Sequence, residues 1–207
     1  IGPNVEIGDN VKIHFHVNIT GNTKIGNGNK IYPFAAIGND PQDLKYSGEE
    51  TKLIIGDNNK IREYVTIHPG TSGGGSLTKI GNNCLFMISS HIAHDCNIGN
   101  NSTFANNTTL AGHVSIENFV TLGGFTGIHQ FCRIGSYSFS AITSVIVKDV
   151  PPFILVSGNT AKPSGLNREG LKRNGFDNDT INLLKKAYKI IYRSGLPLSE
   201  ALSKLAI

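Results

Sequence analysis

A large apolar residue recurs every six positions over most of the chain. One block runs Ile1, Ile7, Ile13, Ile19, Ile25, Ile31, Ile37 and resumes at Ile55, Ile61, Ile67; a second runs Ile80, Phe86, Ile92, Ile98, Phe104, Leu110, Ile116, Leu122, Ile128, Ile134, Ser140, Ile146. Ser140 is the only polar member. Neither an α-helix nor an amphipathic strand keeps this period, whereas a coiled parallel β-helix does. The pattern therefore predicts an all-β solenoid built of hexapeptide repeats.

Two interruptions divide this solenoid, which we expect to occupy residues 1–150. Each hexapeptide supplies a short strand and a corner, and three of them make a triangular turn of about 18 residues, with stacked strands about 4.8 Å apart. Residues 39–54 and 68–79 leave the repeat and are predicted to be ejected loops, where functional residues concentrate. The run Gly73–Gly75 in the second loop opens no expected helix and carries no Walker lysine, so it does not indicate a phosphate-binding loop.

The repeat stops at Asp149–Pro152, and residues 151–207 form a second region. Its first part, residues 153–176, is rich in Gly and Pro and predicts an irregular crossover. A helix is expected between Asp177 as its N-cap and Gly195 as its stop, with an apolar stripe at Ile181, Leu184, Tyr188 and Ile191. A second helix begins near Pro197 or Leu198, and the two are expected to cap the open end of the solenoid.

Both chain ends are expected to be truncated. Ile1 stands within a repeat and is not Met, and the pattern of the last helix breaks off at Ile207.

Composition narrows the class of protein. The net charge of +4, from 19 Lys and Arg against 15 Asp and Glu, is too small to indicate a nucleic-acid partner. No stretch approaches the roughly 18 apolar residues that a membrane span needs, and no signal peptide is recognised. Three cysteines, Cys84, Cys96 and Cys132, share a slot for small inward-facing residues, and an odd count suits a reducing compartment. We therefore expect a cytoplasmic protein.

The candidate chemistry lies in a cluster of histidines. An 18-residue turn places His94, Gly112 and Gln130 in one column. The same turn places His113 one coil above Asp95, with His91 and His129 nearby. The other histidines, His14, His16 and His68, are expected to be surface or core residues.

This column is suited to general-base catalysis. Histidine is the usual base near neutral pH, Asp95 can orient it, and the Gly112 N–H can stabilise an oxyanion. No Ser or Cys nucleophile accompanies the cluster, which favours direct transfer to an acceptor hydroxyl without a covalent enzyme intermediate. A solenoid has flat faces and a filled interior, so the site needs the ejected loops, the C-terminal region or a neighbouring chain. Packing of exposed faces into a closed ring favours a homotrimer.

Two other functions fit the same fold. The pair His91 and His94, with a third His from a neighbouring chain, would resemble the zinc site of the γ-class carbonic anhydrases, although no third His falls at the spacing expected for that class. A non-catalytic structural or ice-binding solenoid would carry regular Thr-x-Thr ladders, and none runs along a face here.

Several motifs resemble one enzyme family. They are His91–Cys96, Ala111–Val114, Gly123–Gly124 with Ile128–Cys132, Gln42–Tyr46, Glu169–Arg173 and Ala187–Gly195. Together they are similar to the UDP-N-acetylglucosamine 3-O-acyltransferases of lipid A biosynthesis, and the resemblance covers essentially the whole chain in order. It implies a left-handed β-helix, a homotrimer with sites between subunits, no metal and no cofactor. It also implies transfer of a 3-hydroxyacyl chain from acyl carrier protein to the 3-hydroxyl of UDP-N-acetylglucosamine, the first step of the pathway. A related acyltransferase that acts later, on an already acylated sugar, is the nearest alternative.

The resemblance also implies residue roles. His94 matches the general base, Asp95 its orienting partner and Gly112 the oxyanion donor. Contacts to the sugar or acyl group are implied for Asp43, Lys45, His91, His113 and Gln130, with His129 nearby, and contacts to the nucleotide for Asn167, Glu169 and Arg173. Phe139 and Ile142 match the acyl-chain ruler, where a bulky Ile predicts a shorter chain than Gly does. Asn174 and Thr160 depart from the family pattern at the nucleotide end.

An acidic carrier protein needs a basic docking surface. The C-terminal region supplies Arg168, Lys172, Arg173, Lys185, Lys186, Lys189 and Arg193.

Overall fold

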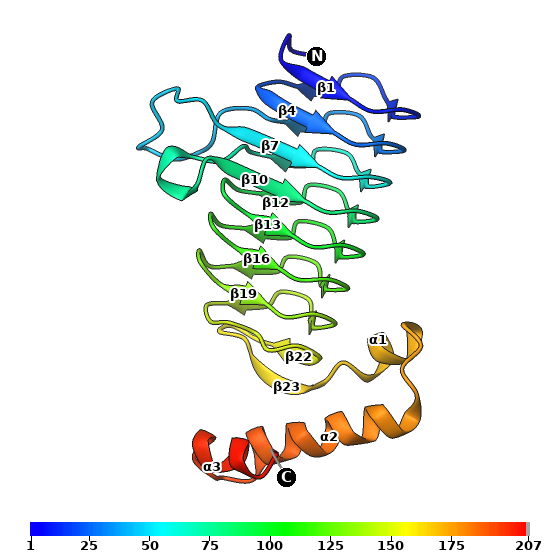
Figure 1. Cartoon of the computed structure of the whole chain (residues 1–207), viewed down its shortest axis with the longest axis vertical. Helices are drawn as coiled ribbons and strands as arrows, with labels where there is room; N and C mark the ends of the chain where they lie inside the picture. Colours follow the sequence, from blue (N-terminus) through cyan, green and yellow to red (C-terminus); the bar gives the residue numbers. More distant parts are fainter. Residues whose placement is uncertain (206–207) are drawn as a thin grey trace.

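The computed structural model, which describes residues 1–205, is a left-handed parallel β-helix closed at its C-terminal end by helices (Figure 1). Its coils stack along the long axis, with the N-terminus at one end and the helices at the other. The fold class predicted by the six-residue period is confirmed.

Three parallel sheets form the faces of the prism. The first sheet holds β1 (Val5–Ile7), β4 (Asn22–Ile25), β7 (Lys52–Ile55), β10 (Leu77–Ile80), β13 (Asn97–Ile98), β16 (Ser115–Ile116) and β19 (Arg133–Ile134). The second holds β2 (Lys12–Ile13), β5 (Lys30–Ile31), β8 (Lys60–Ile61), β11 (Leu85–Phe86), β14 (Thr103–Phe104), β17 (Thr121–Leu122), β20 (Phe139–Ser140), β22 (Ile154–Ser157) and β23 (Lys162–Leu166). The third holds β3 (Asn18–Ile19), β6 (Ala36–Ile37), β9 (Thr66–Ile67), β12 (His91–Ile92), β15 (Thr109–Leu110), β18 (Gly127–Ile128) and β21 (Val145–Ile146).

The register of these sheets puts each repeat residue above the one a full turn earlier. Ile80 pairs with Ile98, and Leu110 pairs with Ile128. From Ile19 onward the inward repeat residues are buried, and Phe86 stacks on Phe104 with ring centroids 4.7 Å apart. Ser140, the polar exception, is also buried, and its hydroxyl lies 2.8 Å from the Thr126 hydroxyl. The core therefore tolerates this hydroxyl because it is hydrogen-bonded.

Both ejected loops leave the prism at the edge between the third and first sheets. One connects β6 to β7 and the other connects β9 to β10, where a short 3₁₀ turn, η1 (Ser72–Gly74), forms. The strands β7 and β10 take up the last residues of the segments expected as loops, 39–54 and 68–79, because those residues pair with each other. The register resumes after each loop, so the coils beyond it are undisturbed.

The corners of the coils use the left-handed backbone region. Residues other than glycine adopt positive φ there, among them Asn83 (58°), Asn101 (58°), Asp95 (59°) and His113 (62°). Asn and Asp tolerate this region better than most residues, since their short side chains bond locally. Two of the predicted site residues thus occupy corner positions whose backbone is held by the neighbouring coils.

The C-terminal region is more regular than its glycines and prolines indicate. The expected irregular crossover is wrong in part: β22 extends the second sheet beyond β20, β23 returns antiparallel to it, and α1 (Arg168–Arg173) follows. The physical reason is the alternation of Ile154 and Val156, both buried in the core.

The two expected helices are confirmed. In α2 (Asn178–Arg193) the N-cap Asp177 accepts a hydrogen bond from the Thr180 N–H at 2.7 Å, and Gly195 beyond its end has φ of 74°. Helix α3 (Leu198–Ser203) follows. Across residues 1–205, every helix is too short or too polar for a membrane span. Residues 206–207 of the predicted region 151–207 lie outside the described part, and the division into domains at residue 150 stays a prediction.

Candidate active site

The predicted column lies at the edge from which the loops leave. His94, Gly112 and Gln130 follow β12, β15 and β18, whose repeat residues are in register. Asp95, His113 and Phe131 form the adjoining column at the left-handed corner positions. The 18-residue turn therefore brings the histidine cluster together as expected. His129 and Gln130 are exposed at the end of the column nearer the C-terminus.

His94 and Asp95 form a hydrogen-bonded pair. The His94 Nδ1 lies 2.8 Å from Asp95 Oδ2, and the aspartate side chain is fully buried while the imidazole keeps 15% of its surface exposed. A proton on Nδ1 shared with the carboxylate leaves Nε2 free to accept one, which is the arrangement of a general base.

The absence of a side chain at Gly112 leaves space for the His94 imidazole. A Cβ on Gly112 would lie 2.7 Å from His94 Nε2 and nearer still to Cε1, well inside van der Waals contact. The N–H of Gly112 has no hydrogen-bond acceptor among residues 1–205, so it stands available beside the imidazole. A glycine is therefore needed for space, and its N–H can serve as an oxyanion donor.

His113 completes the cluster from the next coil. Its Nδ1 lies 4.0 Å from Asp95 Oδ2, and its ring meets that of His94 edge to face with centroids 5.1 Å apart. Phe131 stacks on the other side of His113 at 4.5 Å.

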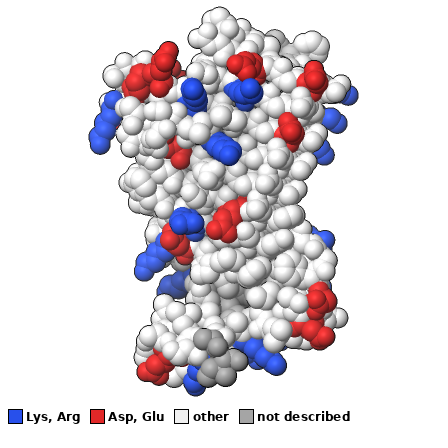
Figure 2. Space-filling model, viewed as in Figure 1, with Lys and Arg blue, Asp and Glu red and all other residues white. Residues whose placement is uncertain are grey.

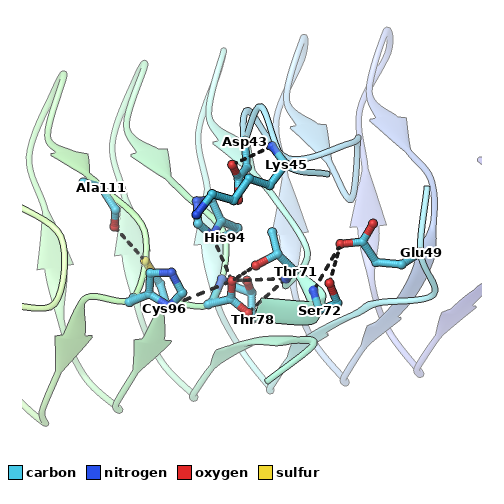
Figure 3. A network of polar contacts seen from close by, with 11 residues as sticks. Asp43, Lys45, Glu49, Thr71, Ser72, Thr78, His94, Cys96 and Ala111 are labelled. Atoms are coloured by element: carbon cyan, nitrogen blue, oxygen red, sulfur yellow. Dashed lines mark hydrogen bonds and ion pairs between the residues drawn. The ribbon is translucent and has the colours of Figure 1, made fainter. Parts of the chain in front are cut away.

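The second loop holds Asp95 with residues that the sequence did not single out. The N–H of Thr71 donates to Asp95 Oδ1 at 3.0 Å, and the Thr71 hydroxyl donates to Oδ2 at 2.6 Å (Figure 3). The Asp95 N–H donates to the Thr78 hydroxyl at 2.8 Å. Gly74 packs directly on the carboxylate, where a Cβ would overlap it. Within the glycine run of this loop, Gly74 is thus the residue that needs no side chain for packing on Asp95, because a Cβ on Gly73 or Gly75 would meet nothing within 4 Å.

His91 and His68, at β12 and just after β9, form a second pair of imidazoles. The His91 Nδ1 lies 2.7 Å from the Thr66 hydroxyl, and the His68 ring meets His91 edge to face at 5.0 Å. Burial, followed by the neighbouring His91, lowers the pKa of His68 to about 4, and burial likewise lowers the pKa of His91. His14 and His16 are exposed and His68 is buried, as expected of surface or core residues, but the sequence did not predict that His68 contacts His91. The loop insertion makes Ile67 pair with Ile92 rather than with a residue one regular turn away, which hides His68 from an 18-residue count.

The first loop lies over the site and is tied to the second. Figure 3 shows the Lys45 side chain pointing toward His94, and the Lys45 N–H donates to Asp43 Oδ1 at 3.0 Å. Glu49, on the same loop, accepts hydrogen bonds from the Ser72 N–H at 3.2 Å and the Ser72 hydroxyl at 3.0 Å. Lys45 and Asp43 are therefore carried on a loop that is anchored beside Thr71.

Comparison with known proteins identifies the family to which this chain belongs. Residues 149–207 match the family model described as UDP-N-acetylglucosamine O-acyltransferase, domain 2, and residues 77–112 match the bacterial transferase hexapeptide model. An acyl-[acyl-carrier-protein]–UDP-N-acetylglucosamine O-acyltransferase from Janthinobacterium sp. (strain Marseille) is 55% identical over 179 residues, which are 86% of this chain and 68% of the relative. The chain belongs to the UDP-N-acetylglucosamine O-acyltransferase family.

Solved structures of the family agree with this assignment. The UDP-N-acetylglucosamine O-acyltransferase from Moraxella catarrhalis is 50% identical, with a TM-score of 0.96 over 100% of this chain and 80% of that one. LpxA from Acinetobacter baumannii is 47% identical, with a TM-score of 0.93 over 99% of this chain and 82% of that one. The chain is thus an acyltransferase, and neither the zinc enzyme nor the non-catalytic solenoid is supported.

One cluster of side chains with metal-ligating donor atoms is found among residues 1–205. Donor atoms of His94, Asp95 and His113 lie within 4.8 Å of one another. However, Asp95 Oδ2 already accepts hydrogen bonds from the Thr71 hydroxyl and pairs with His94, so this oxygen is engaged without an ion.

The remaining predicted site residues lie on other edges of the chain. Asn167 caps α1 by accepting a hydrogen bond from the Gly170 N–H at 3.1 Å, and its amide donates to the Tyr137 carbonyl at 2.8 Å. Glu169 lies within 3.8 Å of Lys172, and Figure 1 shows α1 on the opposite side of the solenoid from the loops. Phe139 and Ile142 stand at the edge between the second and third sheets, with Ile142 67% exposed. A single chain therefore does not bring the predicted ruler residues or the α1 residues to His94.

The space above Gly112 gives a direct test of the His94 position. Gly112→Ala keeps the backbone N–H but pushes the imidazole aside, so kcat for acyl transfer is expected to fall by about 100-fold, the scale of a displacement of about 1 Å at a reacting group. Gly127→Ala is the matched control, because no heavy atom lies within 4 Å of the Cβ it would add. Equal turnover of the two variants in a steady-state assay would contradict the proposed contact.

Proposed function

We propose that this enzyme transfers a 3-hydroxyacyl chain from acyl carrier protein to the 3-hydroxyl of UDP-N-acetylglucosamine, the first step of lipid A biosynthesis. The observation that carries the proposal is the His94–Asp95 pair beside the Gly112 N–H, in a chain whose relatives are named UDP-N-acetylglucosamine O-acyltransferases. The fold of those relatives matches this chain over nearly its whole length.

The reaction needs one base and one oxyanion donor. His94 Nε2 removes the proton of the sugar hydroxyl as its oxygen attacks the carbonyl carbon of the acyl thioester, and Asp95 stabilises the imidazolium that forms. The Gly112 N–H donates to the oxyanion of the tetrahedral intermediate. Collapse of this intermediate breaks the carbon–sulfur bond, and the imidazolium returns its proton to the departing thiolate. No enzyme nucleophile is needed, because the acceptor hydroxyl attacks directly.

The polar groups around the base suit a sugar and an acyl chain. We assign contacts with them to Asp43, Lys45, His91, His113 and Gln130, with His129 at the exposed end. Neutral His91, whose pKa burial lowers, can donate to or accept from a sugar hydroxyl without carrying a charge.

A homotrimer would complete the site. Ile142 and Phe139 lie at a different edge from His94, and so do Asn167, Glu169 and Arg173, so a neighbouring chain must supply the ruler and the nucleotide contacts. The edge that carries Ile142 also exposes apolar side chains at Phe15, Phe34, Ile88 and Phe125. Apolar groups spaced along one edge favour burial against another copy. Three free, buried cysteines fit the reducing cytoplasm, which we assign as the compartment.

The function is tested by activity together with removal of the base. The purified chain is expected to acylate UDP-N-acetylglucosamine with 3-hydroxyacyl-carrier protein as donor. His94→Ala should reduce kcat by about 10²- to 10⁴-fold, as loss of a general base does. A His94→Ala enzyme that assembles correctly and retains its turnover would refute the role of His94. Acceptance of an acylated sugar only would point to the later enzyme of the pathway.

The ruler is tested by donors of graded length. Ile142 is bulky and exposed at its edge, so a preference for the medium-length donors of the family is expected. Ile142→Gly should shift the preference toward longer donors, since each additional buried methylene is worth about 0.8 kcal/mol. Ile88→Gly is the matched control at the equivalent corner three coils earlier and should leave the preference unchanged. Preference of the unaltered enzyme for the longest donor in a competition assay would overturn the assignment.

The carrier protein is expected to dock at the basic face of α2. Lys185, Lys186 and Lys189 border a shallow groove of about 500 Å³ together with Asp179 and Leu183. Elsewhere on the face drawn in Figure 2, Lys and Arg are interspersed with Asp and Glu, so the solenoid there presents no single-sign field.

Charge reversal tests this docking. Replacing Lys185 and Lys186 with Glu should raise KM for the acyl carrier donor more at low salt than at high salt, because surface charges are screened over about 10 Å at 0.1 M salt. KM for the sugar nucleotide should not change. The same reversal at Lys12 and Lys30, exposed at the far end of the solenoid, is the control. If KM for the acyl carrier donor changes neither with the charge reversal nor with the salt concentration, the carrier protein docks elsewhere.

A further inference from the structure

The two ejected loops are linked to the His94–Asp95 pair by hydrogen bonds and by the peptide bond between Thr71 and Ser72. These links run from Glu49 on the first loop to Ser72 on the second, through the adjacent residue Thr71, to Asp95 and His94 (Figure 3). Thr71 contacts the carboxylate at three points, with its N–H 3.0 and 3.1 Å from the two oxygens and its hydroxyl 2.6 Å from Oδ2.

Thr71 is itself held rigidly. Its carbonyl accepts hydrogen bonds from the N–H groups of Gly74 at 3.0 Å and Ser76 at 2.9 Å, and the Gly70 N–H donates to the Lys52 carbonyl of β7. Thr71 is only 4% exposed. The hydroxyl that meets Asp95 therefore belongs to a closed turn fixed to the solenoid, and not to a freely moving loop.

Glu49 is equally well bound, although it lies at the surface. Its carboxylate accepts hydrogen bonds from Ser72 and from the Ser47 N–H at 2.8 Å. These N–H donors, led by that of Ser47, hold the pKa of Glu49 at about 2, so the carboxylate stays ionised at any physiological pH. The charge that accepts these hydrogen bonds between the loops is therefore present throughout the working pH range.

We propose that the two loops form one clamp on the catalytic carboxylate, defined by Glu49, Ser72, Thr71 and Gly74. Within it, Thr71 is a positioning residue that aims Asp95 at His94, and Glu49 is a positioning residue that holds the loop of Asp43 and Lys45 over the site. The clamp deepens the proposed function, on which its kinetic part rests. Its geometry separates the two roles: Thr71 acts on the base, and Glu49 acts on the substrate loop.

Separate roles give separate kinetic signatures. Thr71→Val keeps the shape and the N–H but removes the hydroxyl, so kcat should fall about tenfold, the equivalent of one charge-assisted hydrogen bond of about 1.4 kcal/mol. KM for the sugar nucleotide should stay within about twofold, because the substrate loop is untouched. Glu49→Gln should do the reverse, raising that KM about fivefold with kcat nearly unchanged.

Matched variants distinguish positioning from mere structural support. Thr71→Ser restores the hydroxyl and should recover kcat. Gly74→Ala should resemble Thr71→Val, since its Cβ overlaps the Asp95 carboxylate, whereas Gly73→Ala, with nothing within 4 Å, should behave as the unaltered enzyme. Thr103→Val, a swap of the same kind on β14, controls for the loss of a threonine hydroxyl.

A spectroscopic readout needs no substrate. The proton between His94 Nδ1 and Asp95 should give a downfield resonance in the unaltered protein, which Thr71→Val and Gly74→Ala shift or broaden and Glu49→Gln leaves in place. Other titratable groups near the pair, namely His113, His91, His68 and Lys45, are the same in every variant, so they do not account for a difference.

The outcomes are decisive for each part. An unchanged resonance and unchanged kcat in a folded Thr71→Val protein would overturn the role of Thr71, and so would failure of Thr71→Ser to recover activity. An unchanged KM in Glu49→Gln would overturn the role of Glu49. If the unaltered enzyme does not acylate UDP-N-acetylglucosamine, the proposed function is wrong. The downfield resonance still tests whether Thr71 and Gly74 position Asp95.

Discussion

The coil-to-coil register of backbone hydrogen bonds decides where the side chains of the His94 cluster lie. Each strand is only a few residues long, yet parallel pairing with the coils on either side fixes its height and direction. Because the register is kept from β12 through β18, three corner residues separated by full turns become neighbours. The histidine cluster is therefore a consequence of the stacking and needs no pocket formed by a separate domain.

Within these coils, the burial of the Asp95 carboxylate carries an electrostatic free-energy cost. Its side chain is fully buried at a corner where the backbone is left-handed. Removing a carboxylate from water costs several kcal/mol unless charge-assisted hydrogen bonds replace the solvent. Thr71 and His94 supply them, and Gly74 excludes water by lying against the oxygens. The second loop is thus as much part of the candidate site as the coils are.

Sequence periodicity accounts for part of this structure and misses the rest for identifiable reasons. It predicts the solenoid and the column of His94, Gly112 and Gln130, because these follow from counting regular turns. It does not predict Thr71 or His68, since the loop insertion changes the offset between paired residues at that point. Nor could the repeat period predict that the Asn167 side chain caps α1 and donates a hydrogen bond to the Tyr137 carbonyl. Such local hydrogen bonds depend on where the chain turns after β23.

The placement of both loops at one edge has a consequence for how such enzymes diversify. Ile25 pairs with Ile55 and Ile55 with Ile80, so the two ends of each excursion lie on adjacent coils whatever the length between them. Closing a longer loop costs only about 0.6 kcal/mol for each doubling of its length. Insertions and deletions there can remodel the walls of the site while the core, the corners and the base stay where they are. The fold thereby separates the part that must remain constant for chemistry from the part that is free to change for recognition.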